Sequence, residues 1–427
     1  MNEIKSQTVW RVRILSSTWL SYAGFYFCRK NYTIVKAQIQ ENFQINASEL
    51  AHLFTAYLVA YMLGQYMSGL LGRRTAARVL LLTGMAVTIV CNLVFGTSIL
   101  MGPAGYFPMM IFMVVNGFAQ ATGWPGNVGV LGNWLSRTER GRVMAIWATS
   151  YQLGSSLAKI FASAMLGWLG LSWSFWGASI IMFGVWIFFY IFEKDTPEEA
   201  GLPPVVEEVE VTPEEQAKVS AETGNFLGWS RQVFFSVIFI GMTYFVFKFC
   251  RYAMDSWVPY ILNIKFKLDG EIAGYISTLF DWVGFLGVLF AGWFSDRFFG
   301  GRRHQIVLYM TIGMAITLFL MVSIGMQTLW LFAVFLAVTG FMLMGPDSLL
   351  SGVAAIDVGG RRGAILAAGI INGLGSIGPI IQEEAIGWVL KEYNFTVSFY
   401  LLVFIAILGV GGTAFLSYRS RRGLSNL

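Results

Sequence analysis

Long apolar segments alternate with short polar ones along almost the whole chain. Each apolar segment has about the 20 residues that a helix needs to cross a bilayer. Twelve can be counted: 12–36, 50–71, 78–98, 106–134, 142–169, 173–192, 231–260, 271–294, 304–324, 328–350, 362–390 and 396–418. Backbone groups that face lipid must be hydrogen-bonded within their own segment, and the alternating pattern of a membrane β-barrel is absent. The pattern predicts an all-α membrane protein with twelve transmembrane helices.

One polar stretch interrupts this pattern. Residues 193–230 contain four prolines and the acidic run Glu207-Glu208-Val209-Glu210, and they fall between the sixth and seventh apolar segments. A charge run of this kind is typical of a solvated segment. We therefore expect residues 1–192 and 231–427 to form two six-helix halves, which residues 193–230 join as a cytoplasmic linker.

Composition and charge support a multi-pass membrane protein and set its orientation. Only 12% of the 427 residues are charged, against about 25% in soluble proteins. Twenty of the 29 Lys and Arg residues fall in the termini, the linker and the loops on their side, and only four fall in the opposite loops. The positive-inside rule makes the richer side cytoplasmic, together with both termini. The net charge of +5 thus follows from membrane topology, and no basic face with interleaved aromatic residues predicts a nucleic-acid partner.

Two arginines lie within apolar segments, one in each half. Arg29 follows Phe25-Tyr26-Phe27-Cys28, and Arg251 follows Phe247-Lys248-Phe249-Cys250. A cation at the bilayer centre costs roughly 2.5–3.5 kcal/mol on insertion scales, and arginine does not lose its proton in proteins. The guanidinium fork matches a phosphate with two parallel hydrogen bonds. The two arginines therefore predict a bound anion, with a phosphoryl group as the best fit.

The alternative is that each arginine pairs with a nearby acid. Asp255 lies one helical turn after Arg251, and Asp281 lies within the eighth segment. A candidate coupling set consists of Lys30, Asp255 and Asp281. Its members would either exchange partners as the halves move or form permanent ion pairs. Asp347, after Gly345-Pro346, is expected to be structural at the cytoplasmic end of the tenth segment.

The other polar residues in the segments have more than one candidate role. Lys248 lies three residues before Arg251, on much the same helix face, and would add positive potential. Tyr22 and Tyr26 share a face with Arg29 and would bind a polyol or close the packing between helices. Lys159 either extends its ammonium to the interface or pairs, and Glu383 and Glu384 are acids that would balance such charges. The three cysteines and two histidines have no metal-ligand spacing, so we expect no metal or cofactor.

Longer motifs add a family resemblance. Gly69-Leu70-Leu71-Gly72-Arg73-Arg74 follows the second segment, and Gly292-Trp293-Phe294-Ser295-Asp296-Arg297 follows the eighth. This glycine-then-basic loop, present in both halves, resembles the major facilitator superfamily. The first copy has Arg73 where the family usually has an aspartate.

Three further strings resemble the organophosphate:phosphate antiporters. They are Arg29-Lys30-Asn31 after an aromatic residue, Gly123-Trp124-Pro125 with Asn133-Trp134 and Gln152-Leu153-Gly154, and Arg251-Tyr252 with Asp255, Trp257 and Pro259. The resemblance covers essentially the whole chain and implies alternating-access exchange of a phosphorylated sugar or glycerol phosphate for inorganic phosphate. It gives Arg29 and Arg251 the phosphate-clamp role, and Lys30, Asp255 and Asp281 the gating role.

The site departs from the family pattern at two positions. Tyr151 stands where a substrate-contacting histidine is usual, and Gln65 stands where a cavity lysine is common. Both are candidate substrate contacts, and they imply that the electrostatics of the site have been rearranged.

Two other functions remain open. One branch of the family is a receptor that senses external sugar phosphate without transport. A proton-coupled organic anion symporter is the second, raised by Asp281, Glu383 and Glu384. No P-loop, paired catalytic carboxylates or nucleophile–base arrangement indicates an enzyme. We expect a monomer in a bacterial inner membrane, because one chain contains both halves of the cavity.

Overall fold

The structure is a computed structural model of the whole chain. It describes residues 2–71, 75–135, 143–144, 146–147, 149–205, 231–299 and 303–422, without the side chains of 2–6, 69–70, 296, 299, 352–366 and 368. Several residues used above lie outside this part: Gly72, Arg73 and Arg74 of the first glycine-then-basic loop, and the acidic run of the linker. The side chain of Asp296, in the second glycine-then-basic loop, is also outside it.

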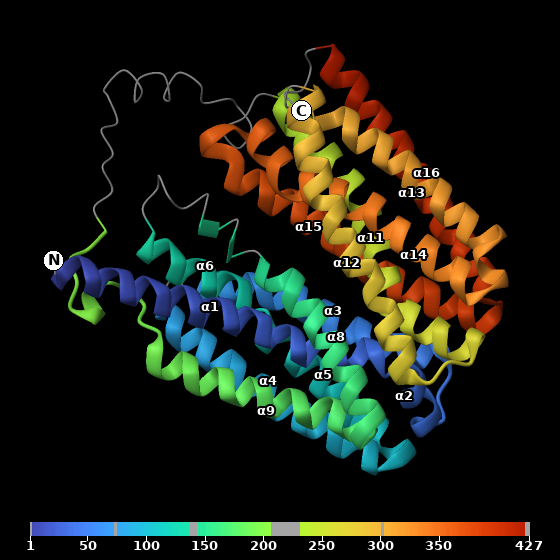
Figure 1. Cartoon of the computed structure of the whole chain (residues 1–427), viewed down its shortest axis with the longest axis horizontal. Coiled ribbons are helices and arrows are strands. Elements are labelled where there is room, and N and C mark those ends of the chain that lie inside the picture. Colours follow the sequence, from blue (N-terminus) through green and yellow to red (C-terminus); the bar gives the residue numbers. More distant parts are fainter. Residues whose placement is uncertain are drawn as a thin grey trace. The chain divides into compact units, whose positions relative to one another are not determined.

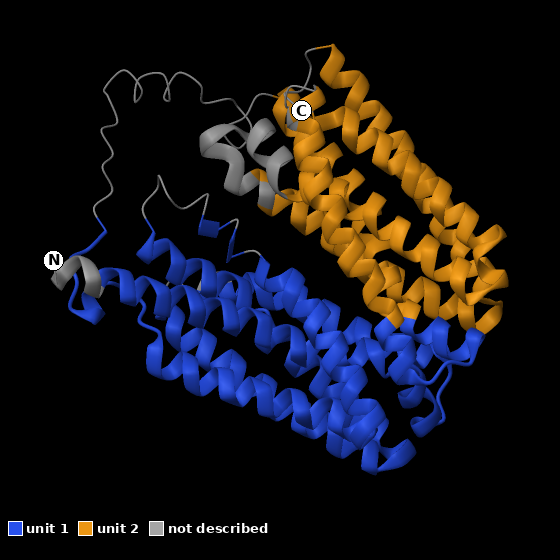
Figure 2. Cartoon of the chain, in the orientation of Figure 1, with its two compact units in different colours: residues 1–208, 259–275 blue, residues 209–258, 276–427 orange. Residues whose placement is uncertain are grey.

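The described residues are helical almost throughout, as Figure 1 shows. They divide into two compact units, residues 1–208 with 259–275 and residues 209–258 with 276–427 (Figure 2). The first unit contains α1 Asn2–Ile34, α2 Lys36–Phe43, α3 Ala47–Leu71, α4 Ala77–Leu100, η1 Gly102–Gly105, α5 Tyr106–Gln120, α6 Gly123–Trp134, α8 Thr149–Leu169, α9 Leu171–Phe192 and η2 Glu198–Ala200.

The second unit contains most of two long helices and all of the later ones. Its helices are α11 Arg231–Phe266, α12 Gly270–Phe299, α13 Arg303–Ser323, η3 Gly325–Gln327, α14 Leu329–Ser348, the π-helix η4 Leu349–Val353, α15 Ala354–Glu392 and α16 Phe395–Arg421. The segment 259–275, where α11 ends and α12 begins, belongs to the first unit. The proposed division at residues 193–230 stays a prediction, because most of that stretch is outside the described residues.

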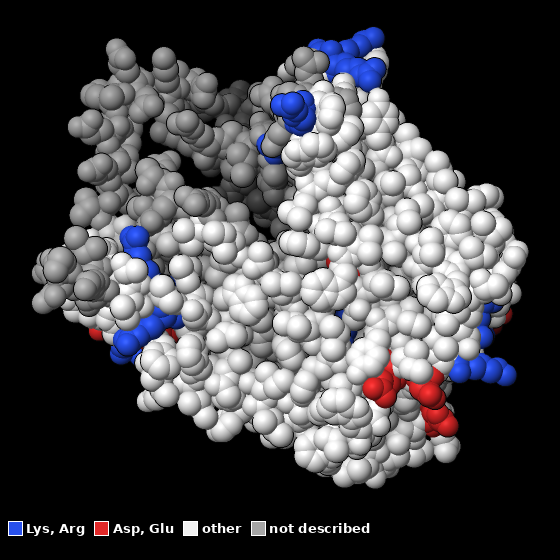
Figure 3. Space-filling view, in the orientation of Figure 1, with Lys and Arg blue, Asp and Glu red and all other residues white. Residues whose placement is uncertain are grey.

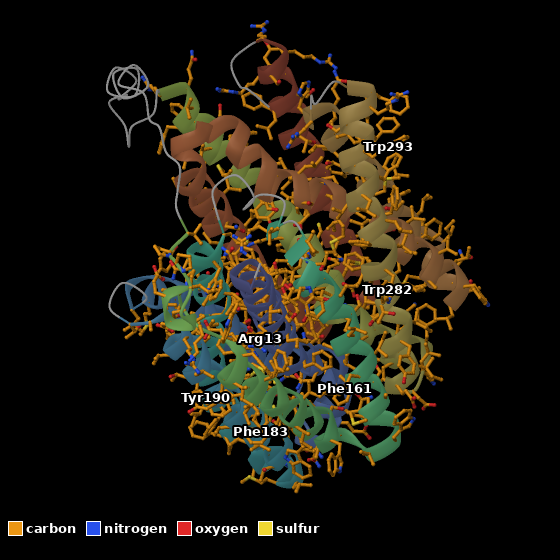
Figure 4. All side chains as sticks on the ribbon, turned by 60° about the vertical axis from the view of Figure 1, so that its left-hand side comes forward. Arg13, Phe161, Phe183, Tyr190, Trp282 and Trp293 are labelled. Carbon is orange, nitrogen blue, oxygen red and sulfur yellow. The ribbon has the colours of Figure 1, made fainter. Side chains whose placement is uncertain are left out.

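Eight helices in the described part of the chain are long and apolar enough to cross a membrane. The other predicted segments coincide with α1, α3, α8 and α15, so the helices are consistent with the twelve predicted spans. The surface shown in Figure 3 is mostly uncharged between the helix ends, where the charged side chains gather. Aromatic side chains such as Trp293 on α12 and Phe183 on α9 are more than half exposed (Figure 4). A chain with this surface is an integral multi-pass membrane protein.

Glycines set the closest helix contacts, and they do so in the same way in both units. A Cβ on Gly117 of α5 would meet the carbonyl oxygen of Tyr57 on α3. A Cβ on Gly340 of α14 would meet the carbonyl oxygen of Phe280 on α12. Small residues let membrane helices approach closely. Gly340 follows Gly117 in the sequence by the same number of residues as Phe280 follows Tyr57. The two units therefore contain an internal repeat in which α5 corresponds to α14 and α3 to α12.

A cluster of ionisable side chains lies at the end of α9 in the first unit. Glu193, the residue after α9, is fully buried, and its Oε2 lies 3.5 Å from Nε of Arg78. The backbone N–H of Arg78 donates to Oδ1 of Asp195 at 2.7 Å, and Nε1 of Trp134 donates to the carbonyl of Lys194 at 2.8 Å. Burial raises the pKa of Glu193 to about 8, and the charge of Asp195 adds to this, while Arg78 opposes it.

The raised pKa of Glu193 predicts a pH-dependent stability. Because the folded chain keeps the Glu193 proton up to about pH 8, it binds more protons than the unfolded chain above the ordinary pKa of about 4.3. The group's contribution is therefore greatest at low pH and declines as pH rises through this window, by at most ~1.4 kcal/mol per pH unit. In detergent, Tm is expected to fall less steeply from pH 5.5 to 8 in Glu193→Gln than in the wild type.

The matched control is Glu392→Gln, which removes a half-exposed carboxylate from the surface pair with Lys391. Its Tm profile is expected to follow that of the wild type. A Glu193→Gln profile as steep as the wild type would show that this carboxyl group does not titrate with folding.

Candidate functional site

Arg29 is held in the first unit by one neutral side chain. Its Nε donates to Oε1 of Gln120 on α5 at 2.9 Å, and the hydroxyl of Tyr57 on α3 donates to the same oxygen at 3.0 Å. Nε2 of Gln120 donates to the carbonyl of Cys28 at 3.1 Å. Gln120 is 1% exposed. Both its amide oxygen and its amide nitrogen are held by hydrogen bonds. Its amide therefore sets the position of the guanidinium.

Three tyrosine rings surround the same guanidinium. Its central carbon lies 4.7 Å from the ring centre of Tyr61, 5.0 Å from that of Tyr26 and 5.8 Å from that of Tyr57. Rings at this range stabilise the positive charge but do not neutralise it. Nη2 of Arg29 is buried, and no acceptor among the described residues reaches it. The first unit thus presents a cation with hydrogen-bonding capacity left over.

Asn31 fixes the rotation of α1 around its axis. Its Nδ2 donates to Oδ1 of Asn92 on α4 at 2.8 Å, and more weakly to the carbonyl of Ser174 on α9 at 3.4 Å.

A cavity of about 10 Å³ lies between Arg29, Asn31 and Asn116. This volume holds about one water molecule, so it is too small for a phosphorylated substrate.

Arg251 in the second unit has a charged partner. Its Nη1 donates to Oδ2 of Asp347 at 2.7 Å. The Asp347 side chain is 6% exposed and that of Arg251 is 26% exposed. An acid therefore pairs with Arg251, as the alternative role of the two arginines predicts, and the structural role of Asp347 stays a prediction. The chain stays helical after Pro346, through η4, so Asp347 lies within a longer helical run and reaches an arginine well inside α11.

Lys248 lies one helical turn before Arg251 and is anchored within the same unit. Its Nζ donates to Oγ of Ser376 at 3.1 Å and to the carbonyl of Asn372 at 3.5 Å, both on α15. It also lies 5.2 Å from the ring centre of Tyr244. The charges of both Arg251 and Asp347 act on Lys248. Three charged side chains therefore form one group in the second unit.

The tyrosines that share a face with Arg29 differ from one another. Tyr26 faces the guanidinium, whereas Tyr22 is 6% exposed and packs against Trp147 and Trp124, with ring centres 5.3 and 5.6 Å apart. Gln65 is half-buried on α3, one turn after Tyr61, and Tyr151 is half-buried on α8. Substrate contacts by Tyr22, Gln65 and Tyr151 remain predictions.

The proposed coupling residues are all buried. Lys30 and Asp255 are each 8% exposed, and Asp281 is 4% exposed. Lys30 belongs to the first unit and the two acids to the second, so the pairing between them stays a prediction. Lys159 is 1% exposed on α8.

Glu383 has partners within its own unit. Its Oε2 accepts from the hydroxyl of Ser256 at 3.0 Å and from Nε1 of Trp257 at 3.1 Å. It therefore joins α15 to α11.

Two partners of the arginines were missed from the sequence. Gln120 is a polar residue in an otherwise apolar segment, which is a signal that was available. Asp347 was noted, but its distance along the chain from Arg251 gave no reason to pair them. In the described part of the chain, no group of three or more His, Cys, Asp and Glu residues is placed to hold a metal ion.

Comparisons with known proteins agree with this architecture. The family model described as Major Facilitator Superfamily matches residues 18–269 and 240–426. Solved structures include a bacterial homologue of the human lysosomal transporter Spinster, with a TM-score of 0.73 and 15% identity over 97% of this chain and 98% of that one. This similarity supports the fold alone.

Relatives in sequence include two whose names concern phosphorylated compounds and one that is named a membrane sensor protein. The glycerol-3-phosphate transporter of Bacillus subtilis is 28% identical over 94% of this chain and 90% of its own length. The glucose-6-phosphate exchanger SLC37A2 of Xenopus tropicalis is 27% identical over 94% and 91%. The membrane sensor protein UhpC of Salmonella typhimurium is 27% identical over 93% and 89%.

These relatives confirm the resemblance to the organophosphate:phosphate antiporters. The family consists of membrane transport proteins and not of enzymes, and its model covers nearly the whole chain. The chain belongs to the Major Facilitator Superfamily.

Proposed function

We propose that this protein is a secondary antiporter that exchanges a phosphorylated sugar or glycerol phosphate for inorganic phosphate by alternating access. The observation that carries the proposal is the environment of Arg29. Its charge is surrounded by an amide and three tyrosine rings, and its buried Nη2 has no acceptor among the described residues. A buried donor on a charged group that lacks a partner is costly. A bound anion would supply the missing acceptor.

A phosphoryl group fits the environment of Arg29. A guanidinium has five N–H donors in a planar fork, and Gln120 occupies only the Nε donor. Nη2 has no acceptor among the described residues, and a phosphoryl oxygen would satisfy it with a charge-assisted hydrogen bond. The names of the relatives in Bacillus subtilis and Xenopus tropicalis also favour a phosphate ester.

The remaining roles follow from this proposal. Arg251 and Lys248 are the cations of the second half, and Tyr22, Tyr26, Tyr151 and Gln65 are the substrate contacts that distinguish one ester from another. Lys30, Asp255 and Asp281 form the ion pairs that change as the halves rock. The partners are the ester, inorganic phosphate and the lipid bilayer. The protein acts as a monomer in a bacterial inner membrane, with both termini in the cytoplasm and no cofactor.

A sensor is the second candidate function, because one relative is named a membrane sensor protein. A sensor needs the same anion site but no exchange. Transport therefore has to be measured separately from binding.

The first experiment measures uptake of labelled phosphate into proteoliposomes preloaded with phosphate. We expect exchange that an external phosphate ester inhibits, and no uptake into vesicles without internal phosphate. Binding of an ester without exchange would instead support the sensor. Uptake driven by a pH gradient in vesicles without phosphate would support a proton-coupled symporter.

Conservative replacement of either arginine tests the clamp. Arg29→Lys and Arg251→Lys keep the charge but lose the fork, so at least one charge-assisted hydrogen bond to the phosphoryl group is lost. Such a bond contributes about 1.5–3 kcal/mol, so exchange is expected to fall by about 10- to 100-fold. Arg231→Lys, at the exposed start of α11, is the matched control and should exchange normally. Near-normal exchange by Arg29→Lys or Arg251→Lys would contradict the clamp.

Gln120 is expected to act as a positioning residue through Arg29. Gln120→Leu removes the acceptor for Nε while keeping a side chain of similar size. The KM for phosphate is expected to rise by about tenfold, the lower end of the range for a hydrogen bond to a charged group, because the guanidinium loses its fixed position. If Gln120 were only structural, Tm would fall and KM would stay at its wild-type value, so both are measured.

A further inference from the structure

The two arginines have partners of different charge. Arg29 has the neutral amide of Gln120 on α5, and Arg251 has the carboxylate of Asp347 on α14. The glycine contacts show that α5 and α14 correspond in the repeat. Gly340 corresponds to Gly117, so Gln120 corresponds to Leu343, which is fully buried. Asp347 lies one helical turn further along α14.

The second half therefore lacks the counterpart of Gln120 and has an acid from the next turn instead. A leucine cannot accept a hydrogen bond from a guanidinium, whereas an aspartate accepts one and also subtracts a unit of charge. This substitution changes the electrostatics of the second half without changing its backbone. The difference between the halves is consequently one of charge and not of architecture.

The printed contact between Arg251 and Asp347 joins one atom of each group. One carboxylate oxygen, Oδ2, meets one nitrogen, Nη1, at 2.7 Å. Oδ1 of Asp347 is buried, and no donor among the described residues reaches it. Arg251 is about a quarter exposed, whereas Asp347 is almost fully buried. An anion can therefore approach the exposed side of Arg251 while Asp347 stays on its buried side.

Charge balance then limits which anion the second half favours. Lys248 and Arg251 supply two positive charges, and Asp347 removes one, so the group has a net charge of +1. A phosphate ester carries about −1.5 to −2 near pH 7, because its second pKa is about 6. A carboxylate within a few ångströms repels each negative charge of the anion. A dianion is therefore repelled more strongly than a monoanion at the same distance.

We propose that Asp347 is a specificity-determining residue, which weakens the binding of dianions at Arg251 and shifts the preference of the site toward singly charged phosphate. The proposal rests on the anion site of the proposed function and adds the charge of the anion that it selects. Weaker binding of a dianion also speeds its release, which an exchanger needs at each turnover.

The test compares two inorganic probes in purified protein in detergent. Sulfate is a dianion throughout the pH range from 5.5 to 7.5, whereas phosphate changes from mostly monoanion to mostly dianion. Calorimetric Kd values for both anions are measured at pH 5.5 and 7.5. Asp347→Asn is expected to tighten sulfate binding by about tenfold or more, because removing one nearby charge changes the interaction by more than 1.4 kcal/mol. Phosphate binding at pH 5.5 is expected to tighten much less.

Three variants serve as comparisons. Asp347→Glu keeps the charge and should keep the wild-type preference between sulfate and phosphate. Glu392→Gln removes a surface carboxylate of the same unit and should leave both Kd values unchanged. Gln120→Glu places an acid beside Arg29, so it should weaken sulfate binding more than phosphate binding at pH 5.5. If Asp347→Asn does not fold, Asp347→Ser, which also removes the charge beside Arg251, takes its place, and an unchanged sulfate Kd in it would overturn the proposal.

The outcomes separate this proposal from the proposed function. Equal sulfate Kd values in the wild type and a folded Asp347→Asn, or weaker binding in the variant, would overturn the role of Asp347. Equal tightening of both anions at pH 5.5 would also overturn it, since the effect would then not depend on anion charge. Phosphate exchange in proteoliposomes is measured in parallel, and its absence in the wild type would contradict the antiporter alone.

Discussion

The structure depends on two guanidinium charges placed within apolar helices. A membrane interior gives such a charge little solvation, so protein groups have to supply it. In the first unit this is done by a single amide oxygen, which also accepts from Tyr57, and by three aromatic faces. In the second unit a carboxylate does it. The surrounding helices are arranged so that these partners reach the arginines.

The internal repeat explains why the two sites are similar, and their partners explain why they differ. The glycine contacts between α3 and α5 recur between α12 and α14, so the backbone frame is the same in both halves. In each half, the side chain that binds the arginine comes from the corresponding helix, α5 or α14. The residue on α14 lies one helical turn further along than the position that corresponds to Gln120. A duplicated frame can therefore carry unequal charges in its two copies.

Much of the fold and part of the site could be predicted from the sequence. Apolar segments and their lengths identify the helices, and the rarity of arginine in such segments singles out Arg29 and Arg251. The partners could not be predicted, because the rotation of α5 and α14 about their axes decides which side chain faces an arginine. Periodicity placed Tyr22 and Tyr26 on one face, but only packing against Trp147 separates the buried tyrosine from the one beside the guanidinium.

The three successive residues Arg29, Lys30 and Asn31 show how tightly rotation constrains this site. Neighbouring residues on an α-helix point about 100° apart, so the three side chains leave α1 in three directions. The hydrogen bond between Asn31 and Asn92 fixes the angular phase of the whole helix. Any insertion or deletion between Phe25 and Asn31 would turn Phe25 relative to that bond by about 100° per residue, and one between Arg29 and Asn31 would turn Arg29 as well. The helix can accordingly change its side chains one at a time during evolution, but it can hardly change its length in this turn.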